Sequence, residues 1–214
     1  MKLFKYTFLC QSALAGLALF MFSCKKQIEN SKTISKTKIE TPPLLDEKIL
    51  INYIQNADII KPKIENGVPF NQLDYDRIIA YDFTGDEETY PNAIDKKGKF
   101  VPVILKQQFL TQRQADQILS ALAKNSSYGE RSAACFQPHL GLVFFKGIKK
   151  VNQISVCLSC NSSITETHIP ARTYRVFNKG TDNEYSFTGF TLSGKKAIIN
   201  LCKEINFHYG KSSI

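Results

Sequence analysis

The sequence has few of the residue patterns that enzymes and nucleotide-binding proteins use. Only three of its 214 residues are histidine, and neither His168 nor His208 has an acidic or nucleophilic residue at the spacing of a catalytic motif. The acidic run 86–88 lacks the pattern of a calcium loop, and the chain has no glycine-rich phosphate loop and no Gly-x-Ser-x-Gly element. These absences exclude phosphate-loop enzymes and hydrolases with a nucleophile elbow, and they favour a protein without catalytic activity.

A concentrated basic surface is also missing. The formal net charge is +9, but residues 1–43 hold seven of the 28 basic residues and only two of the 19 acidic ones. Elsewhere the charges are mixed along the chain, whereas a nucleic-acid-binding protein normally gathers Lys and Arg on one face. We therefore expect no nucleic-acid partner. The lysines of residues 25–43 form a solvated segment that can lie against anionic lipid head groups.

The first 23 residues have the order of an export signal. A basic start is followed by a largely apolar run at 6–22, and Ser23 precedes Cys24, after which the chain becomes polar. The apolar run is at the lower limit of length for a membrane span, so a single membrane anchor is one alternative, although polar residues interrupt the run. Secretion after cleavage at another position is a second alternative. The order of the segments favours a signal peptide at 1–23.

Residues 21–24, Met-Phe-Ser-Cys, resemble the box that ends bacterial lipoprotein signal peptides, in the loosened form found in Bacteroidetes. The resemblance implies that Cys24 carries a thioether-linked diacylglycerol, becomes the mature N-terminus and receives further acyl chains such as palmitate. Several acyl chains together anchor a protein stably. Lys25 stands where many lipoproteins retained at the inner membrane have Asp, so the resemblance favours the outer membrane, with the domain facing the periplasm.

The remaining chain divides into a polar tether at 24–43 and one globular domain at 44–214. The tether is rich in Lys, Ser, Thr, Glu and Asn and ends in two prolines, which predicts a flexible spacer. Helices are predicted at 44–56, at 112–124 with a Thr111–Gln114 capping box, and at 194–206 after Ser193. Strands are predicted at 77–83, at 100–105 in an edge position because of Pro102, and as a hairpin of 140–145 and 151–158. Because strands and helices are segregated along the chain, we expect an α+β domain with a small antiparallel sheet and helices mainly on one face.

Four cysteines remain once Cys10 leaves with the signal and Cys24 takes lipid. They are Cys135, Cys157, Cys160 and Cys202. An even number in an oxidising compartment suits disulfides. A hairpin that turns symmetrically about residues 148–149 places Leu140 opposite Cys157. It also puts Cys135, His139 and Cys160 on one face of the sheet, and Cys157 on the other.

Three hypotheses account for the cluster of Cys135, His139, Cys157 and Cys160. Disulfides would staple the hairpin, each adding ~2–4 kcal/mol, with Cys202 available for an additional one. Three sulfurs and an imidazole would form a tetrahedral zinc site, although Cys157 faces away in the predicted register. The Cys-x-x-Cys pair would exchange thiols and disulfides, although reactive pairs usually lie at a helix N-terminus and none is predicted here. We favour structural disulfides without a cofactor, with zinc as the alternative.

The same region resembles a signature of uncharacterised Bacteroidetes proteins, in which a Cys-aromatic-x-Pro-Arg-His element precedes a hairpin ending in Cys-x-x-Cys-Asn. Here residues 135–139 read Cys-Phe-Gln-Pro-His, without the Arg, and residues 157–161 read Cys-Leu-Ser-Cys-Asn. The similarity covers 128–161 well and 77–207 loosely. It supports the fold and implies no activity.

Together these patterns predict an envelope lipoprotein with a non-catalytic binding or structural domain stapled by disulfides. The alternative is a thiol–disulfide redox protein or a zinc-binding protein that uses the cysteine cluster. The expected partners are the membrane, through the lipid anchor, and a protein or other component of the envelope. Arg172 and Arg175, near Tyr174, could contact an anionic ligand.

Overall fold

The computed structural model describes residues 47–61, 64 and 67–211. The predicted signal peptide, Cys24 and the tether lie outside these residues. Within the described part of the chain, no helix combines the length and the apolar character that crossing a membrane requires. All the elements that follow lie within the predicted domain 44–214.

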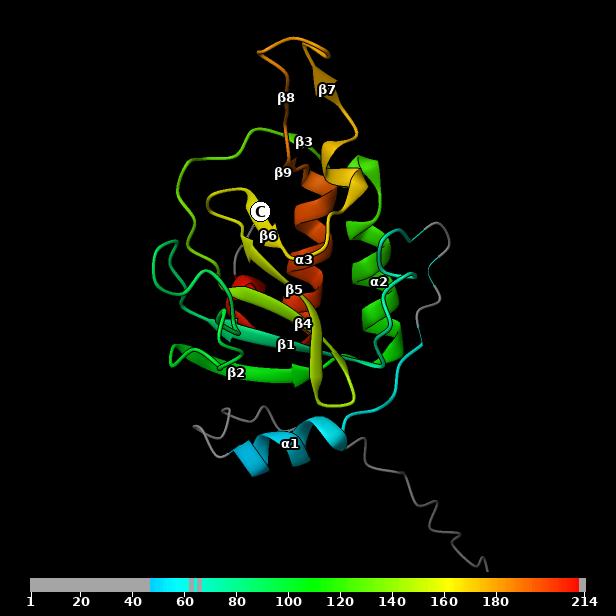
Figure 1. Ribbon diagram of the computed structural model, residues 1–214, viewed down its shortest axis with the longest axis vertical. Coiled ribbons are helices and arrows are strands. Elements are labelled where there is room, and N and C mark those ends of the chain that lie inside the picture. Colours follow the sequence, from blue (N-terminus) through cyan, green and yellow to red (C-terminus); the bar gives the residue numbers. More distant parts are fainter. Residues whose placement is uncertain (1–46, 62–63, 65–66, 212–214) are drawn as a thin grey trace, which may run out of the picture. The chain divides into compact units, whose positions relative to one another are not determined.

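The centre of the domain is a five-stranded antiparallel sheet with the strand order β2-β1-β4-β5-β6 (Figure 1). The strands are β1 (Arg77–Phe83), β2 (Ile104–Phe109), β4 (Leu140–Lys146), β5 (Lys149–Cys157) and β6 (Ser162–Thr165). Neighbouring strands are all antiparallel, and the helices are separate from them along the chain. The predicted α+β class is confirmed.

Both faces of this sheet are buried. On one face, α2 (Gln112–Leu122) and α3 (Leu192–Glu204) pack against the strands (Figure 1). The buried cluster on this face includes Ile78, Leu142, Phe144, Ile154, Ile118 and Ile198. On the other face, Ile54 of α1 (Glu47–Gln55) and residues of the segment 90–103 pack against Ile79, Tyr81 and Val143. Helices therefore cover mainly one face, as predicted.

The edge position of the second strand is confirmed, but its predicted bounds are wrong. β2 runs from Ile104 to Phe109, and not from 100 to 105. Pro102 lies in a turn just before it, where the missing backbone N–H costs no ladder hydrogen bond. Upstream of the turn, Phe100 forms only an isolated bridge with Ile94.

The hairpin of β4 and β5 is confirmed, and its predicted register is wrong by one residue. Leu140 pairs with Val156 and not with Cys157. The turn is centred on Gly147 and Ile148, and Gly147 has a φ of 58°, which favours glycine. The register also shifts between Phe144 and Phe145, where β4 and β5 are irregularly paired. A shift of one residue moves side chains to the opposite face. The predicted register makes Val143 and Ile154 direct partners on one face, whereas in the structure they lie on opposite faces of the sheet.

The first residues of two helices follow from local hydrogen bonds. Thr111 and Gln114 form the predicted capping box at the start of α2. The start of α3 was predicted two residues too late, because Thr191 and not Ser193 is the N-cap. The Thr191 hydroxyl accepts a hydrogen bond from the Gly194 N–H and donates one to the Ser126 carbonyl.

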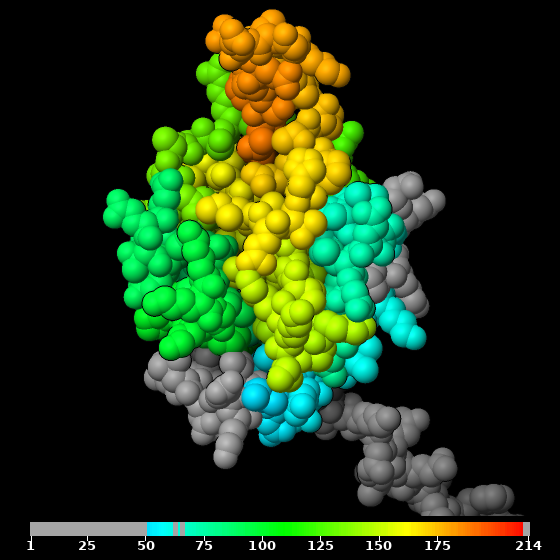
Figure 2. Space-filling model, in the orientation of Figure 1, coloured from blue at the N-terminus to red at the C-terminus, as the bar shows by residue number. Residues whose placement is uncertain are grey.

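Two short antiparallel pairs lie outside the main sheet. β3 (Tyr128–Glu130) pairs with β9 (Gly189–Phe190), and β7 (Val176–Phe177) pairs with β8 (Tyr185–Ser186). The hairpin of β7 and β8 projects from the rest of the domain (Figures 1 and 2). We call residues 174–187 the aromatic arm. The short 3-10 helices η1 (Asn125–Ser127), η2 (Pro170–Thr173) and η3 (His208–Lys211) complete the described elements.

Candidate functional site

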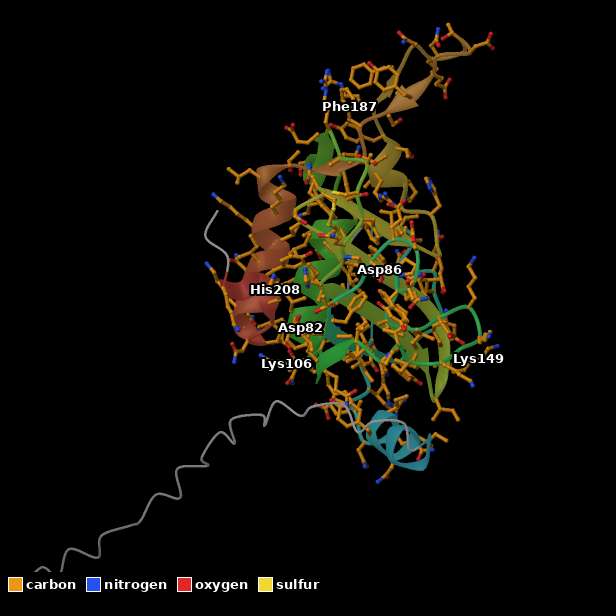
Figure 3. The ribbon with its side chains drawn as sticks, turned by 90° about the vertical axis from the view of Figure 1, so that its left-hand side faces the viewer. Asp82, Asp86, Lys106, Lys149, Phe187 and His208 are labelled. Carbon is orange, nitrogen blue, oxygen red and sulfur yellow. A yellow bond between two sulfur atoms is a disulfide. The ribbon has the colours of Figure 1, made fainter. Side chains whose placement is uncertain are left out.

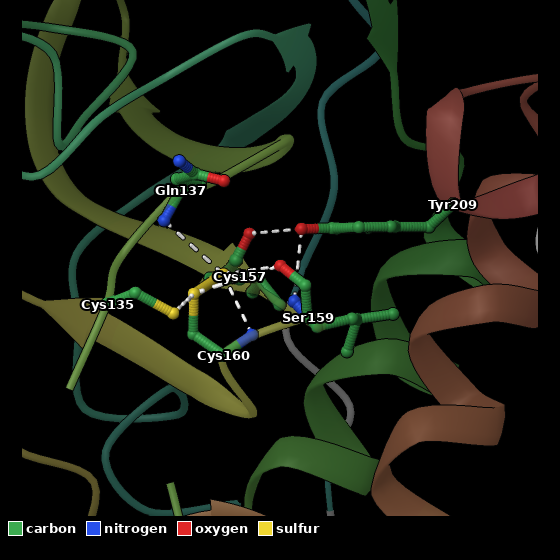
Figure 4. The surroundings of a disulfide bond; sticks show 8 residues. Cys135, Gln137, Cys157, Ser159, Cys160 and Tyr209 are labelled. Carbon is green, nitrogen blue, oxygen red and sulfur yellow. Dashed lines mark hydrogen bonds between the residues drawn. A yellow bond between two sulfur atoms is a disulfide. The ribbon is translucent and has the colours of Figure 1, made fainter. Parts of the chain in front are cut away.

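Three sulfur atoms meet where the β5 strand turns into β6. Cys157 is the last residue of β5, Cys160 lies in the following turn, and these two form a disulfide with their Cα atoms 5.4 Å apart. Cys135 lies in the segment between β3 and β4, and its Sγ is 2.7 Å from the Cys160 Sγ (Figure 4). Cys160 therefore lies between two cysteines, one bonded to it and one in contact with it.

Three hydrogen bonds hold the Cys135 segment beside this turn. The Ala133 N–H donates to the Cys160 carbonyl at 2.8 Å, two residues before Cys135. The Asn161 side chain donates to the Arg131 carbonyl, also at 2.8 Å. The Gln137 N–H donates to the Cys157 Sγ at 3.4 Å, two residues after Cys135 (Figure 4). The contact between Cys135 and Cys160 is thus fixed from both sides.

The three cysteines differ in their access to solvent. Cys157 and Cys160 are both 0% exposed and pack with Phe136. Cys135 is exposed and carries a free thiol. Of the three cysteines, Cys135 is therefore the one that a molecule in solution can reach without opening of the turn.

The Cys157 sulfur is surrounded by hydrogen-bond donors. The Cys160 N–H lies 3.2 Å from it, the Gln137 N–H 3.4 Å, and the Ser159 hydroxyl 3.2 Å. Two backbone N–H groups aimed at one sulfur are what a helix N-terminus supplies to reactive cysteines in other proteins. The turn provides these donors without a helix. The arrangement can stabilise negative charge on the Cys157 sulfur.

Tyr209 holds the backbone on both sides of Cys157. Its hydroxyl donates to the Val156 carbonyl at 3.1 Å and accepts from the Leu158 N–H at 3.0 Å (Figure 4). Burial raises the pKa of Tyr209 to about 12, so its hydroxyl stays protonated and able to donate. The C-terminal η3 thereby anchors the end of β5.

His139 lies in a different cluster from the sulfurs. Its ring stacks on that of His208 with 4.1 Å between centroids and contacts Tyr209 edge-on. The buried Asp82 carboxylate accepts a hydrogen bond from the backbone N–H of His208 at 3.0 Å, and Lys106 lies nearby (Figure 3). Burial, and then the neighbouring His208, lower the pKa of His139. Burial raises the pKa of Asp82 and outweighs the hydrogen bond from the His208 backbone and the nearby positive charges, which lower it.

The other predicted site residues are placed as follows. Cys202 is a buried free thiol on α3, so it forms no disulfide with another described cysteine, and burial raises its pKa. Within the described ranges, no group of three or more His, Cys, Asp or Glu side chains is arranged to hold a metal ion. Cys24 lies outside the described residues. Arg175 lies over the Phe177 ring of the aromatic arm, 4.9 Å from its centroid.

Sequence reasoning missed the parts of the site that act through the backbone. Gln137 and Cys160 donate through N–H groups, and every residue except proline has one, so side-chain type carries no signal. Tyr209 is far from Cys157 along the chain, and nothing in its local pattern indicates the contact.

The fold and the site together define an antiparallel α+β domain with an exposed thiol beside a buried disulfide. Comparisons of this chain with protein-family models, with curated proteins and with solved structures found no match.

Proposed function

We propose that this protein is an exported, lipid-anchored domain that exchanges thiols and disulfides at Cys135, Cys160 and Cys157. One observation carries the proposal: the exposed Cys135 thiol lies 2.7 Å from a sulfur of a buried disulfide. A disulfide that only staples two strands needs no third sulfur in contact with it. An exchange site does need one, because exchange proceeds by attack of a thiolate on a disulfide sulfur.

The proposed reaction with a partner takes place at Cys135. When the disulfide joins Cys135 to Cys160, a partner thiolate attacks the Cys135 sulfur, the Cys135–Cys160 bond breaks, and Cys160 leaves as a thiolate that takes up a proton. A second partner thiolate then attacks the partner sulfur of the mixed disulfide and releases Cys135. The partner is oxidised to a disulfide, the domain gains two thiols, and two electrons are transferred. The reverse sequence reduces a partner disulfide.

Reduction of the intact purified protein by dithiothreitol tests this proposal. Because Cys157 and Cys160 are fully buried, we expect Cys135→Ser to slow reduction of their disulfide by about ten-fold or more, since attack must then await opening of the turn. The measurement is the number of alkylated thiols against time, by mass spectrometry. Cys202→Ser is the matched control and should reduce at the wild-type rate. Equal rates for Cys135→Ser and wild type would refute the proposal.

A second candidate function is non-catalytic binding of an envelope component, with the disulfide as a staple. The aromatic arm favours it, since the arm, which includes Phe187, projects from the domain (Figure 3) and its Tyr174 and Tyr185 are each 45% exposed. The arm contacts the segment that carries Cys135, because the Arg131 guanidinium of that segment lies 5.4 Å from the centroid of the Phe187 ring. The reduction experiment separates the two candidate functions, because Cys135→Ser should not change the rate of reduction if the disulfide is only a structural staple.

A further inference from the structure

Cys160 has a sulfur neighbour on each side, and only one of the two can be bonded to it at a time. We infer that the disulfide moves within the cluster, between a buried Cys157–Cys160 form and a Cys135–Cys160 form that a partner can reach. In this exchange Cys157 is the leaving thiolate. The inference rests on the proposed thiol–disulfide exchange and specifies how that exchange is regulated.

The internal step is balanced without any outside oxidant. The Cys135 thiol loses a proton to water, and its thiolate attacks the Cys160 sulfur. The Cys135–Cys160 bond forms as the Cys157–Cys160 bond breaks, and the electron pair of the broken bond stays on the Cys157 sulfur. One disulfide and one thiol are present before and after the step, so the cluster as a whole is neither oxidised nor reduced.

The surroundings of Cys157 suit a leaving thiolate. Its sulfur already has the Cys160 N–H at 3.2 Å, the Gln137 N–H at 3.4 Å and the Ser159 hydroxyl at 3.2 Å. Hydrogen bonds to an ionised acceptor are stronger than those to a neutral one, so these contacts strengthen when the charge develops. Gln137 is only two residues from Cys135. One segment therefore brings both the attacking sulfur and a donor for the sulfur that leaves.

The shift from the Cys157–Cys160 disulfide to the Cys135–Cys160 disulfide changes how accessible the bond is to solvent. Cys157 and Cys160 are 0% exposed, so the Cys157–Cys160 form is shielded from thiols in solution. In the Cys135–Cys160 form, one sulfur of the bond belongs to an exposed residue. The domain can then hold a disulfide that reacts only during the fraction of time it spends in the second form.

Disulfide mapping of the intact protein tests the inference. The protein is purified without reductant, quenched in acid, alkylated and digested, and the two disulfide-linked peptide pairs are quantified by mass spectrometry. We expect both pairs in the wild type. Ser159→Ala removes one donor to the Cys157 sulfur and should lower the ratio of the Cys135–Cys160 pair to the Cys157–Cys160 pair by about ten-fold. Ser132→Ala, an exposed change in the Cys135 segment, should leave the ratio unchanged.

A second variant tests the inference even if the Cys135–Cys160 form is too scarce to detect in the wild type. In Cys157→Ser, Cys135 is the one described cysteine that remains beside Cys160. Treated with oxidised glutathione, this variant should form the Cys135–Cys160 disulfide within the folded domain. Two free thiols in this variant, or a wild type and Ser159→Ala with identical ratios, would overturn the inference. The proposed function can fail on its own: if both disulfide pairs are present but Cys135→Ser is reduced at the wild-type rate, the disulfide moves without serving exchange with a partner.

Discussion

His139 shows how one residue's surroundings set its protonation. It lies just before β4, is partly buried, and its ring centroid is 4.1 Å from that of His208 in η3. Burial and the neighbouring His208 disfavour the charged form, and together they outweigh a hydrogen bond to the Phe83 backbone and the attraction of Asp82. The result is a pKa below the ordinary value of 6.5. The folded domain therefore binds this proton less readily than the unfolded chain does.

A pH dependence of stability follows from this lowered pKa. Between the lowered value and 6.5 the unfolded chain holds the proton more often, so the free energy of unfolding should fall as the pH drops through 6.5. His139→Gln should weaken this dependence, as measured by urea unfolding at about pH 5.5 and about pH 7.5. His168→Gln, at an exposed position, is the control. Asp82 has a raised pKa, so it contributes to the pH dependence with the opposite sign. An unchanged slope in His139→Gln would contradict the assignment.

At the scale of the element, the N-caps decide where α2 and α3 begin. Both caps are threonines whose hydroxyls accept an N–H from the residue three positions on. Thr111 is reinforced by the Gln114 side chain, which accepts the Thr111 N–H at 3.1 Å. Thr191 is reinforced by its hydrogen bond to the Ser126 carbonyl, which ties α3 to η1 at 2.7 Å.

Removing either cap should destabilise the domain. Thr111→Ala and Thr191→Ala should each lower the free energy of unfolding by about 1 kcal/mol, because an orphan helix N–H loses its partner. Ser193→Ala lies inside the first turn of α3 and should change stability by less than about 0.5 kcal/mol. Urea unfolding midpoints measure all three. A larger loss for Ser193→Ala than for Thr191→Ala would place the cap where the sequence pattern had suggested it.

The β4–β5 hairpin shows why a correct element can have an incorrect register. The six residues Leu140–Phe145 are all buried, so β4 has no alternation of polar and apolar residues to mark its faces. The register was then decided by the turn at Gly147 and by the irregularity at Phe144 and Phe145. Neither feature is visible as a hydrophobic pattern.

At the scale of the whole molecule, we propose that the domain is tied to the outer membrane through Cys24. The leader and Cys24 lie outside the described residues, so the proposal depends on the sequence alone. The cysteine site is consistent with this address, because disulfides persist in oxidising compartments outside the cytoplasm.

Cys24→Ala tests the membrane anchor. We expect the variant to escape signal cleavage and palmitate labelling, because the thioether that precedes both cannot form at alanine. Cys10→Ala, in the apolar run of the leader, is the matched control and should be processed and labelled normally. Gel mobility, acyl labelling and membrane fractionation provide the measurements. Wild-type labelling of Cys24→Ala would remove the argument for a lipoprotein.

Local interactions explain what could be read from the chain before its fold was known. β1 at Arg77–Phe83, the capping box of α2 and the existence of the β4–β5 hairpin depend on residues close in sequence, through apolar runs and short-range hydrogen bonds. The predicted hairpin also placed Cys135 and Cys160 on one face of the sheet, and in the structure their sulfurs are in contact.

Contacts between distant segments required the folded chain. His139 stacks on His208, and Tyr209 clamps the backbone around Cys157, only because η3 returns to the end of the sheet. The hydrogen bonds that surround the Cys157 sulfur come from backbone groups, whose direction depends on how two segments pack and not on which side chains they carry. The predicted register placed Cys135 and Cys160 on one face and was wrong in placing Cys157 on the other, because Cys157 is bonded to Cys160. Only tertiary packing brought all three sulfurs together and aimed two backbone N–H groups at the Cys157 sulfur.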